Sequence, residues 1–201
     1  MKLNDYKLIF VAVGLISVLL IATPALADVL RLPGTEQFSQ LYLLGPGQMA
    51  ENYPFNIEAD QNYSVYVGVA NQMGSSLYYM VYVMFMNQSD QLPNAAAGMP
   101  SSLQPLYEYR FAVQDGESWE SPLTFSVSDP SFSGNQSFIK TLTINNDVFD
   151  INKPSLWDSN TTTFSYKLLF ELWIYNPQSG SVDYNNRYVD LQLNLTNSLL
   201  S

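Results

Sequence analysis

The residues that could do acid–base chemistry in this sequence are carboxylates, and their densest cluster is Asp115, Glu117 and Glu120 beside Trp119. Hydrolysis of a glycosidic bond needs two carboxylates placed across a sugar, and an aromatic ring can stack on that sugar. The same acidic residues flank Gly116 between two expected strands, a setting typical of a solvated turn. We therefore expect no catalytic residue, and the alternative is a carboxylate-dependent hydrolase acting on envelope glycans.

Other chemistries are excluded by composition. The chain of 201 residues contains no His and no Cys. It therefore has no thiolate nucleophile, no disulfide, no His-based catalytic triad and none of the usual His and Cys ligands of zinc or haem. Its 8 basic and 18 acidic side chains give a formal net charge of −10, which opposes binding to a phosphate backbone. We expect no cofactor and no nucleic-acid partner.

Oxygen donors of the kind that calcium prefers occur in two clusters. They are Asn145, Asn146, Asp147 and Asp150, and Asp158, Ser159 and Asn160. Neither cluster has the spacing of an EF-hand loop, with its central Gly and terminal Glu. Metal binding is therefore left open by the sequence.

Glu171 interrupts an apolar segment, which invites a functional interpretation as a buried carboxylate. In a strand over residues 164–176, Phe170 and Leu172 share one face and Glu171 lies on the other. We therefore expect Glu171 to meet solvent or a cation such as Arg187.

Tyrosines are frequent, with 14 in the chain, and several of them fall in adjacent expected strands. These are Tyr63, Tyr66, Tyr78, Tyr79 and Tyr82. They could form a glycan- or protein-binding face, although cross-strand aromatic pairing explains them more simply.

The elements that must position these residues are strands, because apolar residues alternate with a period of two and no window shows a sustained helical stripe. We expect eight strands, over residues 38–44, 63–71, 77–87, 106–113, 119–127, 138–144, 164–176 and 184–196. Val65, Val67 and Val69 in the second, and Leu191 and Leu193 in the last, should point inward.

The connections between the strands complete this architecture. Turn residues at 72–76 and 176–180 predict two hairpins, which join the second strand to the third and the seventh to the eighth. Residues 89–105 and 152–163 are predicted to be loops. The pattern as a whole predicts a mainly β protein with an immunoglobulin-like antiparallel β-sandwich, held by its core alone.

The sandwich is expected to follow one membrane helix. Residues 8–27 carry no charge, and a helix of that length spans about 30 Å, the thickness of a bilayer's hydrocarbon core. Lys2 and Lys7 favour a cytoplasmic leader over residues 1–7, which places residues 28–201 outside the cell membrane. Small residues before Asp28 also fit signal cleavage after Ala27, so a secreted, released protein is the alternative.

Five Asn residues begin N-x-Ser/Thr sequons and are candidates for N-glycosylation. They are Asn62, Asn87, Asn135, Asn160 and Asn194. All five are expected in loops, at strand ends or on an outward face, and at least Asn135 and Asn160 are predicted to be modified.

Two segments, LLGPGQMAENYP at 43–54 and YSVYVGVANQMG at 63–74, resemble an uncharacterised archaeal family of membrane-associated proteins, the domain of unknown function catalogued as sixteen-sixteen. The resemblance continues through FELWIYN at 170–176 and RYVDLQLNLT at 187–196. It implies a membrane-tethered extracytoplasmic β-domain and brings no catalytic residues. Members of the family often carry several membrane helices, whereas this chain offers one.

The expected function is that of a non-enzymatic, membrane-anchored ectodomain with a role in envelope structure or recognition. Its partners would be the lipid bilayer, through residues 8–27, and other envelope proteins or glycans. The family-like motifs look structural, with Gly45 and Gly47 in a turn and Gly68 at a close backbone contact.

Overall fold

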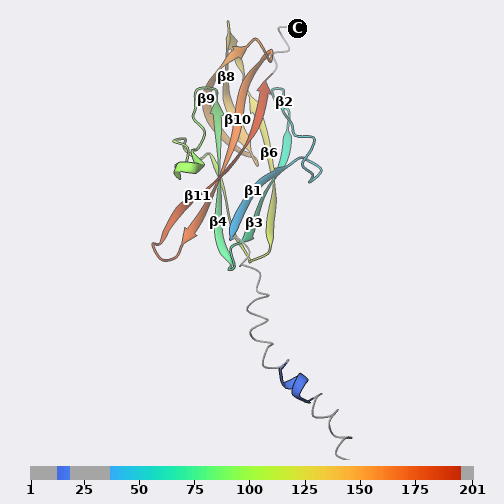
Figure 1. The fold of residues 1–201 in the computed structure, drawn as a ribbon. Coiled ribbons are helices and arrows are strands. Elements are labelled where there is room, and N and C mark those ends of the chain that lie inside the picture. The colour runs from blue at the N-terminus through green and yellow to red at the C-terminus, as the bar shows by residue number, and fades with distance from the viewer. Residues whose placement is uncertain (1–12, 19–36, 196–201) are drawn as a thin grey trace, which may run out of the picture. The chain divides into compact units, whose positions relative to one another are not determined.

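The computed structural model describes residues 13–18 and 37–195 (Figure 1). The chain divides into two units, Met1–Gln37 and Phe38–Ser201. In the first unit residues 13–18 are helical, and the rest of the expected membrane helix over residues 8–27 lies outside the described residues. Within the described ranges, no helix is both long and apolar enough to cross a bilayer.

The second unit is mainly β, and its described part contains eleven strands and one short 3-10 helix. These are β1 (Phe38–Leu44), β2 (Asn56–Ile57), β3 (Tyr63–Gln72), β4 (Leu77–Asn87), η1 (Ala95–Ala97), β5 (Tyr107–Val113), β6 (Ser118–Ser128), β7 (Ser131–Ser133), β8 (Gln136–Ile144), β9 (Asp147–Asp158), β10 (Thr163–Asn176) and β11 (Ser181–Leu195). The eight predicted strands are all present, whereas β2, β7 and β9 were not predicted as strands.

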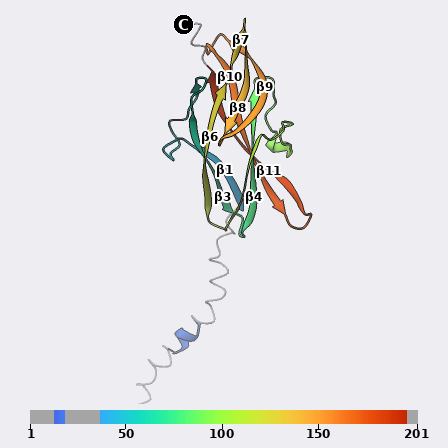
Figure 2. The same ribbon diagram turned by 180° about the vertical axis from the view of Figure 1, so that it is seen from behind.

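The strands form two groups that share one core in a β-sandwich-like fold, seen from opposite sides in Figures 1 and 2. One group has the order β1-β3-β6-β8-β9, with β7 also paired to β8. The other has the order β5-β4-β10-β11, and β2 pairs in parallel with the end of β11. All other pairings are antiparallel, and the groups are continuous because β9 pairs briefly with β10 at Trp157–Phe164.

Alternating apolar residues build the core, as the sequence predicts. Val65, Val67 and Val69 of β3 are buried, as are Leu191 and Leu193 of β11. Side chains that point inward from the two strand groups meet there and exclude water, which is the main stabilising contribution to such a fold.

Buried tyrosine hydroxyls link the two groups across this core. Tyr79 of β4 lies 2.8 Å from the hydroxyl of Ser39 in β1. Tyr109 of β5 donates to the carbonyl of Pro122 in β6 at 2.9 Å. A buried hydroxyl needs a hydrogen-bond partner, so each of these tyrosines favours one relative placement of the strands that it joins.

The predicted hairpin at residues 72–76 is wrong, because β3 and β4 belong to different strand groups. Both sides of β3 are occupied, by β1 and by β6. The side chain of the fully buried Asn71 holds the crossing, since its Nδ2 donates to the carbonyls of Ser75 at 2.8 Å and Val113 at 2.9 Å. The hairpin at residues 176–180 is confirmed, with Asn176 paired to Ser181.

The predicted loop at 152–163 is also wrong, because β9 runs to Asp158. Pro154 lacks an N–H group but sits where β9 pairs with β8 alone, and an edge position of this kind tolerates Pro. A register shift and a positive φ of 44° at Asn152 mark a bulge in this strand. The predicted loop at 89–105 is confirmed; it contains η1 and protrudes at one side of the domain (Figures 1 and 2).

Candidate functional site

Strand β10 is buried on both faces, which sets the environment of Glu171. Phe170 and Leu172 point into the main core, as predicted from their parity. Leu169, on the opposite face with Glu171, is also fully buried, in a smaller apolar cluster that includes Met84 and is covered by Leu103 of the loop between β4 and β5. That loop therefore turns the outer face of β10 into an interior surface.

Glu171 is only 2% exposed, so the prediction that it meets solvent or Arg187 is wrong. Its Oε1 accepts a hydrogen bond of 2.6 Å from the backbone N–H of Ser101. Its Oε2 accepts one of 3.1 Å from the indole Nε1–H of Trp173. The carboxylate thus anchors the loop to β10, although no Lys or Arg forms an ion pair with it within the described residues.

A cavity of about 660 Å³ lies between this loop and the strands β4, β5, β10 and β11. It is lined by the polar residues Ser101, Ser102, Gln104, Glu108 and Glu171, and by Tyr82, Met84, Pro100, Leu103, Pro105, Trp173 and Val182. A concave site of this size with a few convergent polar groups on an apolar wall is typical of a ligand pocket.

Two lining residues, Tyr82 and Trp173, form a small aromatic cluster with Tyr184. The ring of Trp173 lies 5.4 Å from that of Tyr82 and 5.6 Å from that of Tyr184, centroid to centroid. Burial, and then the nearby negative charge of Glu171, raises the pKa of Tyr184 to about 12. The hydroxyl of Tyr184 therefore stays protonated at neutral pH and can donate a hydrogen bond.

Two buried hydroxyl oxygens in this region, those of Ser101 and Tyr184, have no hydrogen-bond partner among the described residues. Buried polar atoms are nearly always paired, so each such atom calls for an explanation. At the rim of the cavity, Glu108 is exposed and its two carboxylate oxygens accept bonds of 2.7 and 3.1 Å from Arg110. The negative charge of Glu108 is thus balanced within the chain.

The carboxylate cluster chosen from the sequence lies elsewhere, and two of its three side chains, those of Asp115 and Glu120, have structural partners. Asp115 accepts a hydrogen bond of 2.7 Å from the backbone N–H of Gly74. Glu120 accepts one of 2.8 Å from the hydroxyl of Tyr42. Asp115 and Glu117 lie in the exposed connection between β5 and β6, as the interpretation as a surface turn predicts, whereas Glu120 is exposed on β6.

Trp119, which was considered as a sugar platform, packs inside the domain's own aromatic cluster. Its ring stacks on that of Phe111 at 3.6 Å with an interplanar angle of 8°. It also meets the edge of Tyr109 at 5.2 Å. One face of Trp119 is therefore occupied by the chain itself.

The two candidate calcium clusters lie where turns flank β9, and Asp147, Asp150 and Asp158 belong to the strand itself. Asn145 and Asn146 have positive φ values of 49° and 73° at the β8–β9 hairpin, which suits Asn. Asp158 accepts a hydrogen bond of 2.9 Å from the backbone N–H of Asn160. Within the part of the chain that the structure describes, no group of three or more acidic side chains lies close enough together to hold a metal ion.

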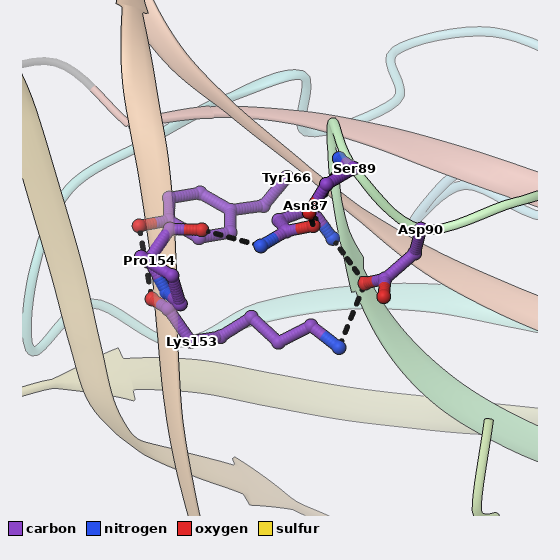
Figure 3. Close-up of polar contacts among 6 residues, drawn as sticks. All are labelled: Asn87, Ser89, Asp90, Lys153, Pro154 and Tyr166. Atoms are coloured by element: carbon purple, nitrogen blue, oxygen red, sulfur yellow. Dashed lines mark hydrogen bonds and ion pairs between the residues drawn. The ribbon is translucent and has the colours of Figure 1, made fainter.

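The five sequons differ in how free their side chains are. Asn62, Asn135 and Asn160 are exposed. Asn87 is partly buried, and Figure 3 shows its Nδ2 donating to the carbonyl of Pro154, at 2.7 Å. Asn194 is also partly buried, and its Nδ2 contacts Asn56 at 3.4 Å.

Figure 3 also shows why the turn after β4 is held in place. Asp90 accepts a hydrogen bond of 2.9 Å from the backbone N–H of Asn87 and forms an ion pair of 2.7 Å with Lys153 of β9. The turn that carries the Asn87 sequon is therefore tied to the neighbouring strand group at several points.

Sequence reasoning missed the site around Glu171 because its parts come from distant segments. Ser101 and Glu171 are 70 residues apart, and nothing in the local pattern of either segment indicates the contact. The available signal was the apolar residue Leu169 on the supposedly outward face of β10, which indicated that something covers that face.

Solved structures that resemble the chain share little sequence with it. A β-glucosidase from Listeria innocua in complex with gluconolactone has a TM-score of 0.35 and 9% identity, over 81% of this chain and 16% of that one. A chain in the complex of Zinc 2-glycoprotein and Prolactin inducible protein from human seminal plasma has a TM-score of 0.37 and 8% identity. The match covers 82% of this chain and 98% of that one. The sporulation control protein Spo0M from Bacillus subtilis has a TM-score of 0.38 and 10% identity. The match covers 79% of this chain and 49% of that one.

Comparison by sequence points to a family. No curated protein matches the chain. The family described as Domain of unknown function (DUF1616) matches residues 33–149, which is more than half of the chain and includes the segments 43–54 and 63–74 that carry the resemblance. Glu171 and Trp173 follow the matched region. The resemblance to the family is thereby confirmed, and the chain belongs to the DUF1616 family.

Proposed function

We propose that this chain is a membrane-anchored, extracytoplasmic domain of immunoglobulin-like architecture that serves envelope recognition by binding a ligand, without catalysis. The observation that carries the proposal is the cavity lined by the buried carboxylate of Glu171 and the hydroxyl-bearing Ser101. Trp173 supplies an aromatic wall beside them. Binding sites combine such apolar walls with a small number of polar groups that orient the ligand.

The anchor is supported by the sequence. Residues 8–27 are uncharged and follow Lys2 and Lys7, which favours a retained helix with the β-domain outside. Intact mass of the protein extracted from native membranes tests this part. A mass that includes residues 8–27 supports the anchor, whereas a mature start at Asp28 supports the released, secreted alternative.

Ligand binding is tested on the full chain in detergent micelles, labelled with 5-fluorotryptophan. The chain has three Trp residues, so its fluorine spectrum is simple, and the Trp173→Phe variant assigns the Trp173 signal. A panel of amines, envelope oligosaccharides and peptides is added one class at a time. A saturable shift of the Trp173 signal supports recognition at this cavity, and no shift with any class contradicts it.

A second candidate function is the carboxylate-dependent hydrolysis of envelope glycans. It is favoured by one observation, which is that Glu108 and Glu171 line the same cavity. A glycosidase uses such a pair, one as acid and one as nucleophile or base. Glycan hydrolysis by the full chain that is lost in both Glu108→Gln and Glu171→Gln would establish it.

The hydrolase test has a matched control in the cluster that the sequence singled out. A triple variant of Asp115, Glu117 and Glu120 to their amides changes three carboxylates outside the cavity lining. Hydrolysis should persist in this variant if the cavity is the active site. Loss of hydrolysis in the folded triple variant would instead show that Asp115, Glu117 or Glu120 is catalytic.

A further inference from the structure

The charge of Glu171 is the starting point of a more specific inference. The side chain is 98% removed from solvent, yet its two partners, Ser101 N–H and Trp173 Nε1–H, are neutral donors. A buried carboxylate is stabilised best when a cation accompanies its hydrogen bonds. The chain supplies the hydrogen bonds, and no cationic side chain within the described residues pairs with this group.

The carboxylate also has acceptor capacity that the chain does not use. Each carboxylate oxygen can accept about two hydrogen bonds, and each oxygen of Glu171 accepts one from the protein. The hydroxyl oxygen of Ser101 is a further buried acceptor without a partner. These free acceptor positions belong to two residues that line the same cavity and are joined by the bond from the Ser101 N–H, and a primary ammonium group carries three N–H donors.

The surface around these acceptors suits the aliphatic stem that carries a primary ammonium group. Tyr82 and Trp173 line the cavity, and aromatic rings attract cations. Met84, Leu103 and Val182 supply apolar surface for an aliphatic stem. The chain's net charge of −10 draws cations toward the protein and raises their rate of encounter.

We propose that the cavity binds a primary alkylammonium group, with the ammonium hydrogen-bonded to Glu171 and Ser101 and its aliphatic stem against Met84 and Leu103. The inference rests on the proposed function, since it names the ligand class of the same cavity. The ammonium can come from a free diamine or from a lysine side chain of another protein, which share this chemistry.

Titration of the full chain in detergent micelles tests the proposal by calorimetry and by the fluorine signal of Trp173. The probes are cadaverine for a free diamine, Nα-acetyl-lysine-N-methylamide for a lysine side chain, and 1-pentanol as an uncharged control. We expect saturable binding of at least one ammonium probe and a shift of the Trp173 signal. Binding of cadaverine alone identifies a free amine, and binding of the lysine derivative supports a protein side chain.

Variants separate recognition from structure. Glu171→Gln keeps an acceptor for the loop but removes the charge, and it should weaken binding by about tenfold or more. Glu117→Gln, in an exposed turn, should leave binding unchanged. Ser101→Ala keeps the backbone N–H that Glu171 accepts and should weaken binding by about threefold to tenfold.

The outcomes also separate the proposal of ammonium binding from the broader proposal that the cavity recognises a ligand. Equal binding of 1-pentanol and cadaverine would overturn it, as would equal loss of affinity in Glu171→Gln and Glu117→Gln. A Trp173 shift with oligosaccharides but not with ammonium probes would overturn the ligand class and leave recognition at the cavity standing. If Glu171→Gln lowers the melting temperature, Ser101→Ala provides the test in a variant that keeps the carboxylate.

Discussion

The hydroxyl oxygens of Ser137 and Tyr166 lie 2.7 Å apart and join β8 to β10 across the core. Both residues are fully buried. The Tyr166 hydroxyl also lies 3.3 Å from the carbonyl of Lys153 in β9 (Figure 3). Together with the bonds made by Tyr79 and Tyr109, this contact links the two strand groups in a chain that has no cysteine.

The buried tyrosines predict a loss of stability at high pH. Burial raises the pKa of Tyr109 and of Tyr166 to about 12, against about 10 in an unfolded chain. The unfolded state therefore releases these protons first as the pH rises. The free energy of unfolding should be unaffected by them below about pH 10 and should fall between about pH 10 and 12. Urea unfolding at a series of pH values measures this.

Two variants isolate the tyrosine contribution to that pH dependence. Tyr166→Phe removes a buried hydroxyl and should make the fall in stability above about pH 10 shallower. Tyr78→Phe changes a tyrosine that is 41% exposed and should leave the pH dependence as it is. A fall of the same slope in both variants would contradict the assignment to buried tyrosines.

Gly68 should not tolerate a side chain, although its close neighbour is the side chain of Tyr42 and not the backbone contact that the sequence suggested. The ring of Tyr42 lies directly over its α-carbon, and a β-carbon there would overlap with that ring. Gly68→Ala should therefore destabilise the domain by about 1–3 kcal/mol in denaturant unfolding, because Tyr42 must move and release Glu120. In a Tyr42→Ala background the same substitution should cost almost nothing. If Gly68→Ala lowers the free energy of unfolding equally in the wild-type and Tyr42→Ala backgrounds, the overlap with Tyr42 is not the cause of the destabilisation.

The faces of β11 predict opposite responses to a charge. Leu193 is fully buried, so Leu193→Asp should cost more than about 3 kcal/mol of unfolding free energy. Gln192 points to the other face and is only partly buried, so Gln192→Asp should cost less than about 1 kcal/mol. Denaturant midpoints of the two variants measure the difference. Similar midpoints would refute the assigned register of this strand.

The sequons predict an uneven pattern of glycosylation in the native protein. Asn135 and Asn160 are exposed and should be modified, as expected from the sequence. Asn87 should be unmodified in the folded protein, because its Nδ2 already donates to Pro154 and a sugar on that atom would displace the bond. Peptide mass spectrometry of native protein reports the occupancy of each site. Full occupancy at Asn87 with none at Asn135 would reverse the conclusion.

The strands and their faces could be predicted from the sequence because they depend on local alternation. Val67 and Leu193 were placed in the core by parity alone, and the structure buries both. The β10–β11 hairpin was also predictable, since Pro177 and Gly180 favour a tight turn between two apolar runs. Gly180 has a positive φ of 69°, which glycine adopts without strain.

Strand partners and the cavity were decided only by tertiary structure. The turn after Asn71 suits a hairpin, yet it becomes a crossing because β1 and β6 occupy both sides of β3. Parity correctly placed Glu171 opposite Phe170, but parity does not say what covers a face. That face is covered by Ser101 and its neighbours, from 70 residues away, so the environment of the carboxylate depends on a contact that no local pattern encodes. Local sequence patterns therefore specify the strands, their faces and the excluded chemistries, whereas long-range packing selects the polar group that becomes buried.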